Sequence, residues 1–327
     1  MRRLGVPADE LLFSPAVDRY GARLALVFGN QAAGGLCPYF RAGGCLHCDI
    51  GAGEGRAFTL EENRARLRWF HGHYATLLPE LAHLVVYDSG SVLNPRELPA
   101  EFLDELFVWA RTLPALRALS LDSREAFVRG DRLVALAERA GDAIAVRPIL
   151  GLETSDDHRR DGLLRKRMPR RAVLRAFDEV ARAAERVGGG RVGLDVNLVV
   201  AGPGTDAASA AEDAAATARF AFAEGGARGL SVDLNLHPYY PSGRGRAAFP
   251  DHPRCALPTL VEALEAILRE RAERMPAAGL FIGWEDEGHD TEGSQRALDG
   301  MRLAAMIDRF NAAPSAELLQ SLREPSR

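Results

Sequence analysis

A regular alternation of short apolar segments with longer amphipathic ones is the feature that most constrains the fold. The apolar segments predict strands at residues 22–28, 83–91, 116–123, 143–154, 191–200, 229–239 and, shorter, 279–284. The amphipathic segments predict helices after Thr59 and at residues 100–113, 132–140, 171–187, 211–225, 257–275 and 294–311. Strands separated by helices pair in parallel, so the sequence predicts an α/β fold. About six βα units fall short of the eight of a closed barrel, which favours a partial (β/α)6 barrel.

No internal repeat or long linker divides the chain of 327 residues, so we expect one barrel. Its core is predicted over residues 1–275, and residues 276–327 are predicted to form a C-terminal extension packed on the barrel. In barrels of parallel strands the chemistry lies at the carboxyl ends of the strands. Polar residues at those ends are therefore the candidate site residues.

Composition and charge exclude several classes of protein. Hydrophobic residues make up 47% and charged residues 26% of the chain, which excludes a disordered or fibrous protein. The net charge of −4 provides no global basic field for nucleic acid, although a local patch is compatible with it. No apolar run predicts a membrane span, and the N-terminal segment lacks the apolar core of a secretory signal. Four cysteines are too few for a disulfide scaffold, so we expect a cytoplasmic protein without membrane contact.

Three of the four cysteines lie close together after the first predicted strand. Cys37, Cys45 and Cys48 have the spacing C-x7-C-x2-C, in a segment that contains glycines. Three thiolates suit an iron–sulfur cluster or zinc. A cluster held by three cysteines keeps one iron open for a non-protein ligand, whereas structural zinc needs a fourth ligand, which His47 or Cys255 would supply. The remaining alternative is three unrelated buried thiols that pack as small hydrophobes.

Three further segments place polar residues at the carboxyl ends of later predicted strands. They are Asp88–Leu93 with Glu97, Leu121–Glu125 and Ile149–Thr154. Together with the cysteine segment and in the same order, they resemble the radical S-adenosylmethionine (SAM) superfamily. Within it they are most similar to the branch that includes the Elp3-like proteins and the radical SAM subunit of archaeosine synthase. The chain departs from the usual C-x3-C-x2-C spacing by its longer first gap, and from the branch by Asp122 and Glu125, which replace Glu and Pro.

The resemblance implies a [4Fe–4S] cluster held by Cys37, Cys45 and Cys48, with SAM bound to the open iron. His47 stands where the superfamily commonly carries an aromatic residue near the adenine of SAM. The other residues that the resemblance brings to SAM are Ser89, Gly90, Ser91, Asp122, Arg124 and Glu153. Asn197 and His237, polar residues inside later apolar strands, are predicted to complete the cofactor site from a polar barrel interior.

Each of these residues also has a structural interpretation. Gly90 allows the backbone to approach a ligand closely, but a plain turn explains the same segment. An ion pair between Asp122 and Arg124 accounts for both charges, and Glu153 could be the N-cap of the next turn. Buried asparagine and histidine side chains are usually satisfied hydrogen bonders, which applies to the two strand residues.

Four segments outside the motifs carry charge or sulfur. The basic run Arg165–Arg171 is either a solvated loop and helix start or a contact for an anionic substrate. Tyr239–Arg246 is either a plain loop or a flexible, anion-binding rim. Cys255 is a silent thiol, a fourth metal ligand or a hydrogen-atom donor. The acidic segment 284–290 is a solvated loop, or it closes the barrel or meets substrate amines.

The function that the resemblance implies is reductive cleavage of SAM. The usual product is a 5′-deoxyadenosyl radical, which takes a hydrogen atom from a small-molecule substrate. Modification of a tRNA base and transfer of a 3-amino-3-carboxypropyl group stay open. An external electron donor such as flavodoxin or ferredoxin is implied. The alternative from another class is a zinc-stabilised barrel that binds a partner without redox chemistry.

Overall fold

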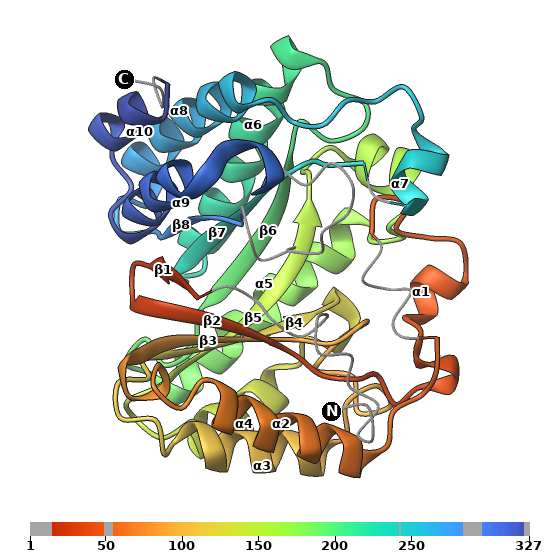
Figure 1. Ribbon diagram of the computed structural model, residues 1–327, viewed down its shortest axis with the longest axis vertical. Coiled ribbons are helices and arrows are strands. Elements are labelled where there is room, and N and C mark those ends of the chain that lie inside the picture. The colour runs from red at the N-terminus through yellow and green to blue at the C-terminus, as the bar shows by residue number, and fades with distance from the viewer. Residues whose placement is uncertain (1–14, 49–54, 242, 284–295, 324–327) are drawn as a thin grey trace.

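In the part of the chain that the structure describes, eight strands form one sheet, and the spatial order of these strands follows the chain (Figure 1). The computed structural model describes residues 15–48, 55–241, 243–283 and 296–323. The strands are β1 (Ala16–Asp18), β2 (Gly21–Val27), β3 (Leu81–Tyr87), β4 (Ala118–Ser123), β5 (Ala145–Glu153), β6 (Leu194–Val200), β7 (Val232–Pro238) and β8 (Leu280–Ile282). β1 is antiparallel to β2, and every later neighbouring pair is parallel. This order confirms the predicted partial barrel: β2 to β7 are the six predicted strands, and β8 is the shorter one that follows them.

Helices cover the outer face of the sheet (Figure 1). They include α2 (Leu60–His73), α3 (Ala100–Ala110), α4 (Gly130–Ala140), α5 (Arg170–Val187), α6 (Ala207–Gly226), α8 (Leu257–Arg274), α9 (Arg296–Ala312) and α10 (Ala316–Arg323). In α5, Val173, Phe177 and Val180 recur at helical spacing and are fully buried against the sheet. The predicted helix after Thr59 is α2, and it begins with a capping box in which Glu62 N donates to Thr59 Oγ1 at 3.2 Å.

The C-terminal part of the chain adds to the same sheet. β8 pairs with β7, and the N–H of Val17 in β1 donates to Asp308 Oδ1 of α9 at 3.3 Å. The division at residue 275 stays a prediction, and the acidic segment 284–290 lies outside the described residues. Among the helices of the described ranges, none combines the length and the apolar character that crossing a bilayer requires.

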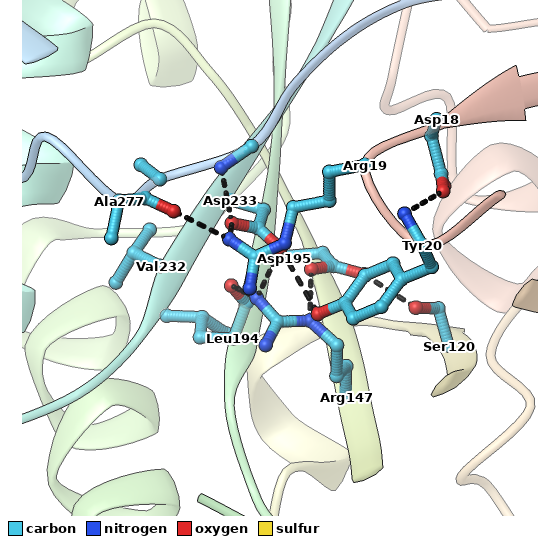
Figure 2. A network of polar contacts seen from close by, with 12 residues as sticks. Asp18, Arg19, Tyr20, Ser120, Arg147, Leu194, Asp195, Val232, Asp233 and Ala277 are labelled. Carbon is cyan, nitrogen blue, oxygen red and sulfur yellow. Dashed lines mark hydrogen bonds and ion pairs between the residues drawn. The ribbon is translucent and has the colours of Figure 1, made fainter. Parts of the chain in front are cut away.

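Arginine and aspartate fill the amino-terminal end of the barrel (Figure 2). Arg147 of β5 is 2% exposed and lies between two carboxylates. Its Nε is 2.6 Å from Asp195 Oδ1, and its Nη2 is 3.0 Å from Asp233 Oδ2. Arg19, from the β1–β2 turn, binds Asp233 Oδ1 at 2.8 Å. Because a buried charge is tolerated only when it is paired, these contacts fix β5, β6 and β7 to the start of the chain.

A histidine extends this network across the barrel. His83 Nδ1 of β3 is 2.5 Å from Asp18 Oδ2, and its Nε2 is 2.7 Å from Ser120 Oγ. Ser120 Oγ in turn donates to Asp195 Oδ2 at 2.5 Å. Burial alone would raise the pKa of Asp18, but His83 and Arg23 lower it to about 2. The polar groups at the amino-terminal end of the barrel thus bind one another. The candidate site residues lie at the opposite, carboxyl end of the strands.

Candidate active site

The three predicted cysteine ligands lie on one loop that leaves the carboxyl end of β2. Cys37 precedes the single turn α1 (Pro38–Arg41), and its carbonyl accepts from Arg41 N at 2.9 Å. Cys45 has a φ of 51°, and its carbonyl accepts from Cys48 N at 3.0 Å. Cys37 and Cys45 are buried, Cys48 is partly exposed, and all three are free thiols. We call residues 36–48 the cysteine loop.

The segment of the chain that follows β5 is joined to the cysteine loop by backbone hydrogen bonds. Cys45 N donates to Arg165 O at 3.1 Å, and Leu46 N donates to Leu164 O at 2.9 Å. Arg167 Nη2 donates to Ala42 O at 3.0 Å. The backbone between two predicted ligands is therefore held by the segment that follows β5.

A third segment also binds the loop through an arginine. Arg244 Nη1 donates to Phe40 O and to Gly44 O, at 3.0 Å each, and its guanidinium lies 3.5 Å from the centre of the Phe40 ring. Arg244 belongs to the short helix α7 (Gly243–Ala248), which lies on the same side of the molecule as α1 (Figure 1). Part of the segment 239–246, for which the sequence predicts a plain loop or a flexible, anion-binding rim, is thus helical, and its Arg244 contacts the cysteine loop.

Arg124 brings the end of β4 to the same loop. Its Nη1 lies 3.4 Å from Cys45 Sγ, and its guanidinium is 3.6 Å from the centre of the Tyr39 ring. Its Nη2 donates to Lys166 O at 2.6 Å. Its ion-pair partner is Glu125, at 3.3 Å, so the sequence interpretation that pairs it with Asp122 is not what the structure shows. A predicted SAM residue thus contacts a predicted cluster ligand.

Glu153 ends β5 with a φ of 64° and lies inside the site. Its Oε1 is 2.6 Å from Lys166 Nζ and 3.6 Å from His47 Nε2. Burial would raise the pKa of Glu153, but Lys166 and His47 lower it well below its ordinary value. Lys166 was expected to be a solvated part of the basic run or a substrate contact, and it is instead buried against this carboxylate. Glu153 is therefore an ionised partner of the cysteine loop and not an N-cap.

The Ser89–Ser91 segment follows β3 and surrounds a buried carboxylate. Ser89 Oγ donates to Gly35 O at 2.9 Å, and Ser91 N donates to Glu97 Oε2 at 3.0 Å. A Cβ at Gly90 would lie 1.5 Å from Glu97 Oε2. The glycine is therefore required by the approach of Glu97, where the sequence suggested the approach of a ligand. Burial raises the pKa of Glu97 despite its hydrogen bonds.

Asp122, Asn197 and His237 lie on the strands β4, β6 and β7. Burial raises the pKa of Asp122 to about 7; Lys166 and His237 act against this shift. Asn197 Oδ1 accepts from Asn235 Nδ2 at 2.9 Å, so the interpretation of Asn197 as a satisfied hydrogen bonder is confirmed. Asp122 is thus a carboxylate whose pKa is raised to about 7, and burial also raises the pKa of Asp88 well above its ordinary value.

Within the described residues, no group of three or more His, Cys, Asp or Glu side chains is positioned to hold a metal ion. The donor set fits an iron–sulfur cluster in its chemistry, since three thiols share one loop and Arg124 lies beside Cys45. His47 Nδ1 is buried and has no hydrogen-bond partner among the described residues, so it can receive a ligand. Cys255 lies in the hydrophobic core, where burial raises the pKa of its thiol to about 12, which favours a silent thiol.

The fold and the site together define a partial α/β barrel with a cysteine loop at the carboxyl ends of its parallel strands. No family model matches the chain, and no curated protein matches it in sequence. Archaeal Elp3 of Methanocaldococcus infernus, with an N-terminal deletion, has a TM-score of 0.46 and 11% identity, covering 75% of this chain and 53% of that one. SuiB of Streptococcus suis has a TM-score of 0.49 and 10% identity, covering 82% of this chain and 50% of that one.

The chain thus spans about half the length of these two solved structures. At 10% and 11% identity, the likeness to these two structures is one of overall fold alone. Substrate and reaction have to be argued from the residues of this chain.

Proposed function

We propose that this protein is a radical SAM enzyme whose [4Fe–4S] cluster is held by Cys37, Cys45 and Cys48. The observation that carries the proposal is the guanidinium of Arg124, 3.4 Å from Cys45 Sγ on a loop fixed by two other segments. The thiolate is the form of cysteine that binds iron. Burial raises the pKa of Cys37, so a bound metal would have to displace its proton.

The residues around the loop would bind SAM and keep it in place. Once cluster and SAM are bound, one-electron reduction supplies the homolytic cleavage of a carbon–sulfur bond of SAM. His47 Nδ1 would meet the adenine, and the main chain of Ser89–Ser91 would lie beside the amino acid part. The buried pair of Glu153 and Lys166 would fix the position of His47, and burial of these groups would exclude water.

The substrate that we propose is a small molecule bound at the carboxyl ends of the strands. Asp122 is the interior group that can take or give a proton near pH 7, because burial raises its pKa to about 7. An external one-electron donor would reduce the cluster. Modification of a tRNA base and 3-amino-3-carboxypropyl transfer are the alternatives that the product analysis distinguishes.

The proposal is tested by anaerobic reconstitution of the chain with iron and sulfide. We expect a broad visible absorbance near 400 nm that is lost in Cys45→Ala, and 5′-deoxyadenosine after addition of SAM and dithionite. Thr112→Ala, an exposed change two residues after the end of α3, serves as the control that retains both.

Other products would redirect or end the proposal. Methylthioadenosine formed only under reduction would keep the cluster and move the chemistry to aminocarboxypropyl transfer. A colourless protein with one zinc per chain and no response to SAM would establish the zinc-stabilised binding barrel instead.

A further inference from the structure

Side chains close the barrel between its first and last strands. Among the strands that the structure describes, β1 pairs with β2 and β8 pairs with β7, so the sheet ends at β1 and at β8. Arg19 crosses between these two ends and donates to Ala277 O, shortly before β8, at 2.7 Å. The guanidinium of Arg23 in β2 lies 3.7 Å from the centre of the Phe281 ring in β8. We call this junction the seam, and its closure depends on side chains of the β1–β2 hairpin.

A row of three short contacts joins the hairpin to the rest of the barrel. Asp18 Oδ2 is 2.5 Å from His83 Nδ1, and His83 Nε2 is 2.7 Å from Ser120 Oγ. Ser120 Oγ is in turn 2.5 Å from Asp195 Oδ2. All four side chains are buried, and Figure 2 shows Asp18, Ser120 and Asp195 near one another. The row thus runs from β1 through β3 and β4 to β6.

The three contacts of this row need three protons. An ionised carboxylate supplies none, a serine hydroxyl supplies one and a neutral imidazole supplies one. Both carboxylates of the row are ion-paired and therefore act only as acceptors. Asp195 is 2.6 Å from Arg147 Nε, and Asp18 is 3.6 Å from Arg23 Nη1. The third proton is therefore the one that makes the His83 ring an imidazolium.

We propose that His83 is a proton-dependent latch that keeps the seam of the barrel closed. As an imidazolium, it donates from both ring nitrogens and ties the β1–β2 hairpin to β4 and, through Ser120, to β6. Loss of one proton leaves two lone pairs facing each other in one of the three contacts, which weakens the hold on the hairpin. Because the closed form binds one proton more than the open form, closure weakens as pH rises.

The charges around the ring make this proton removable. The titratable and charged groups that face His83 or its partners are Asp18, Arg19, Tyr20, Arg23, Arg147, Asp195 and Asp233. The three arginines balance the three aspartates, so the network is neutral without the extra proton. The Tyr20 ring lies 5.1 Å from the His83 ring, and burial raises the pKa of Tyr20 to about 12, so it stays uncharged. The proton is thus required by the hydrogen bonds and not by the net charge.

The proton also has a path to solvent. His83 and Arg19 line the same cavity at the amino-terminal end of the barrel, with about 260 Å³ of empty volume. The side chain of His83 is 3% exposed, whereas that of Arg19 is 30% exposed. Water in this cavity can therefore exchange the proton without unfolding the chain.

The first test reads the protonation of the ring in the full chain, with histidine labelled by ¹⁵N. Histidine in an unfolded chain loses its proton at about pH 6.5. At pH 8 we expect one of the eight histidine rings to carry protons on both nitrogens, and we expect its NMR signal to be missing in His83→Gln. Eight neutral rings at pH 8 would overturn the proposal, and so would a doubly protonated ring that persists in His83→Gln.

The second test measures opening of the seam by hydrogen exchange of peptides that cover residues 15–27. One linked proton changes the opening equilibrium by up to about tenfold per pH unit. After correction for the intrinsic effect of pH on exchange, we expect opening to increase at least about tenfold from pH 6 to pH 9 in the wild type, and less than about twofold in His83→Gln. Peptides that cover α5 should show no such increase. Wild-type opening that does not depend on pH would reject the latch.

Two further variants complete the test. His158→Gln is the matched control, because His158 is exposed and follows β5, and it should open as the wild type does. Asp18→Asn keeps an acceptor for His83 Nδ1 but removes the negative charge, so the seam should open at a pH lower by about one unit or more. Asp18→Asn also decides the question if His83→Gln does not fold, since an unchanged opening pH would reject the latch.

Discussion

Arg124 is the residue in which the predicted cluster site and the predicted SAM site meet. Its contact with Cys45 Sγ is joined by the Tyr39 ring and by Lys166 O. Residues that hydrogen bond to metal ligands typically change metal affinity or activity 10–100-fold when they are replaced. We therefore expect Arg124→Met to lower iron retention about tenfold or more and to lower the reduction potential of the cluster.

The measurements are iron content after gel filtration and an EPR-monitored redox titration. Arg124→Lys keeps the charge but lacks the planar fork that reaches three partners, so it should recover only part of the loss. An unchanged potential and full iron content in Arg124→Met would show that the contact with Cys45 has no influence on the cluster.

Asp122 should make stability depend on pH. Burial raises its pKa from 3.8 to about 7, so the folded state favours the protonated form. This contribution to stability is fully present below pH 3.8 and is lost as pH rises through 7. Asp122→Asn removes the charge, so the variant should be more stable than the wild type by about 4 kcal/mol at pH 8, with no gain at pH 4.

Urea unfolding from pH 4 to pH 8 measures this difference. Asp142→Asn is the control, because Asp142 is almost fully exposed and pairs only at 3.4 Å with Arg191. A gain for Asp122→Asn that does not change with pH would mean that the carboxylate is not the cause.

The sequence motifs predicted that Arg124 and Glu153 belong to the site. They did not predict the partners of these two residues, Cys45 and Lys166. Cys45 precedes Arg124 by 79 positions, and Lys166 follows Glu153 by 13. Neither separation has a helical or strand period, so only the tertiary fold brings the partners together. No local signal marked the pair, since Lys166 lies 13 positions after Glu153 and between two arginines.

At the scale of elements, the cysteine loop depends on a close backbone contact. A Cβ at Gly44 would lie 2.8 Å from Arg165 O and 3.1 Å from Tyr39 O, and neither backbone atom can move aside easily. Gly44→Ala should therefore destabilise the loop by about 1–3 kcal/mol. Hydrogen exchange of peptides that cover residues 36–48 should become faster by one to two orders of magnitude.

Gly72→Ala in α2 is the matched control for this substitution. No atom lies within 4 Å of the added Cβ, and alanine is the better helix former, so the loop should not respond. Equal protection of the loop in wild type and Gly44→Ala would mean that the contact with Arg165 does not hold it.

Element positions followed from the sequence far better than the packing of the irregular segments did. β5 was predicted at 143–154 and lies at Ala145–Glu153, because an apolar run with flanking helices has few alternatives. The short strand β1 was missed, since three residues carry no period. α7 was missed because its glycines predict a loop, and its helix is stabilised by the contact of Arg244 with the cysteine loop.

At the scale of the whole molecule, the ion pairs that stabilise the barrel and the candidate site residues lie at opposite ends of the strands. The amino-terminal end holds paired charges around Arg147, whereas the carboxyl end holds the cysteine loop and the raised pKa of Asp122. The sequence indicated a polar face on two of these strands. Asp195 and Asn197 in β6, and Asp233 and Asn235 in β7, alternate with buried apolar residues at the two-residue period of a strand. The sequence did not show which end of the barrel is filled by ion pairs. That depends on the ion pair between Arg19, in the β1–β2 turn, and Asp233.

Arg147→Met tests this division directly. Removing one partner of a buried ion pair costs about 3–5 kcal/mol, here because Asp195 would lose its cation and Asp233 would keep only its ion pair with Arg19. The folded fraction of the variant should bind iron and SAM as the wild type does, since its contacts are with the opposite end. Arg186→Met, which breaks an exposed pair with Asp131, should change the free energy of unfolding by less than about 1 kcal/mol. If Arg147→Met instead weakened SAM binding at an unchanged folded fraction, the two ends of the barrel would be coupled and the division would not hold.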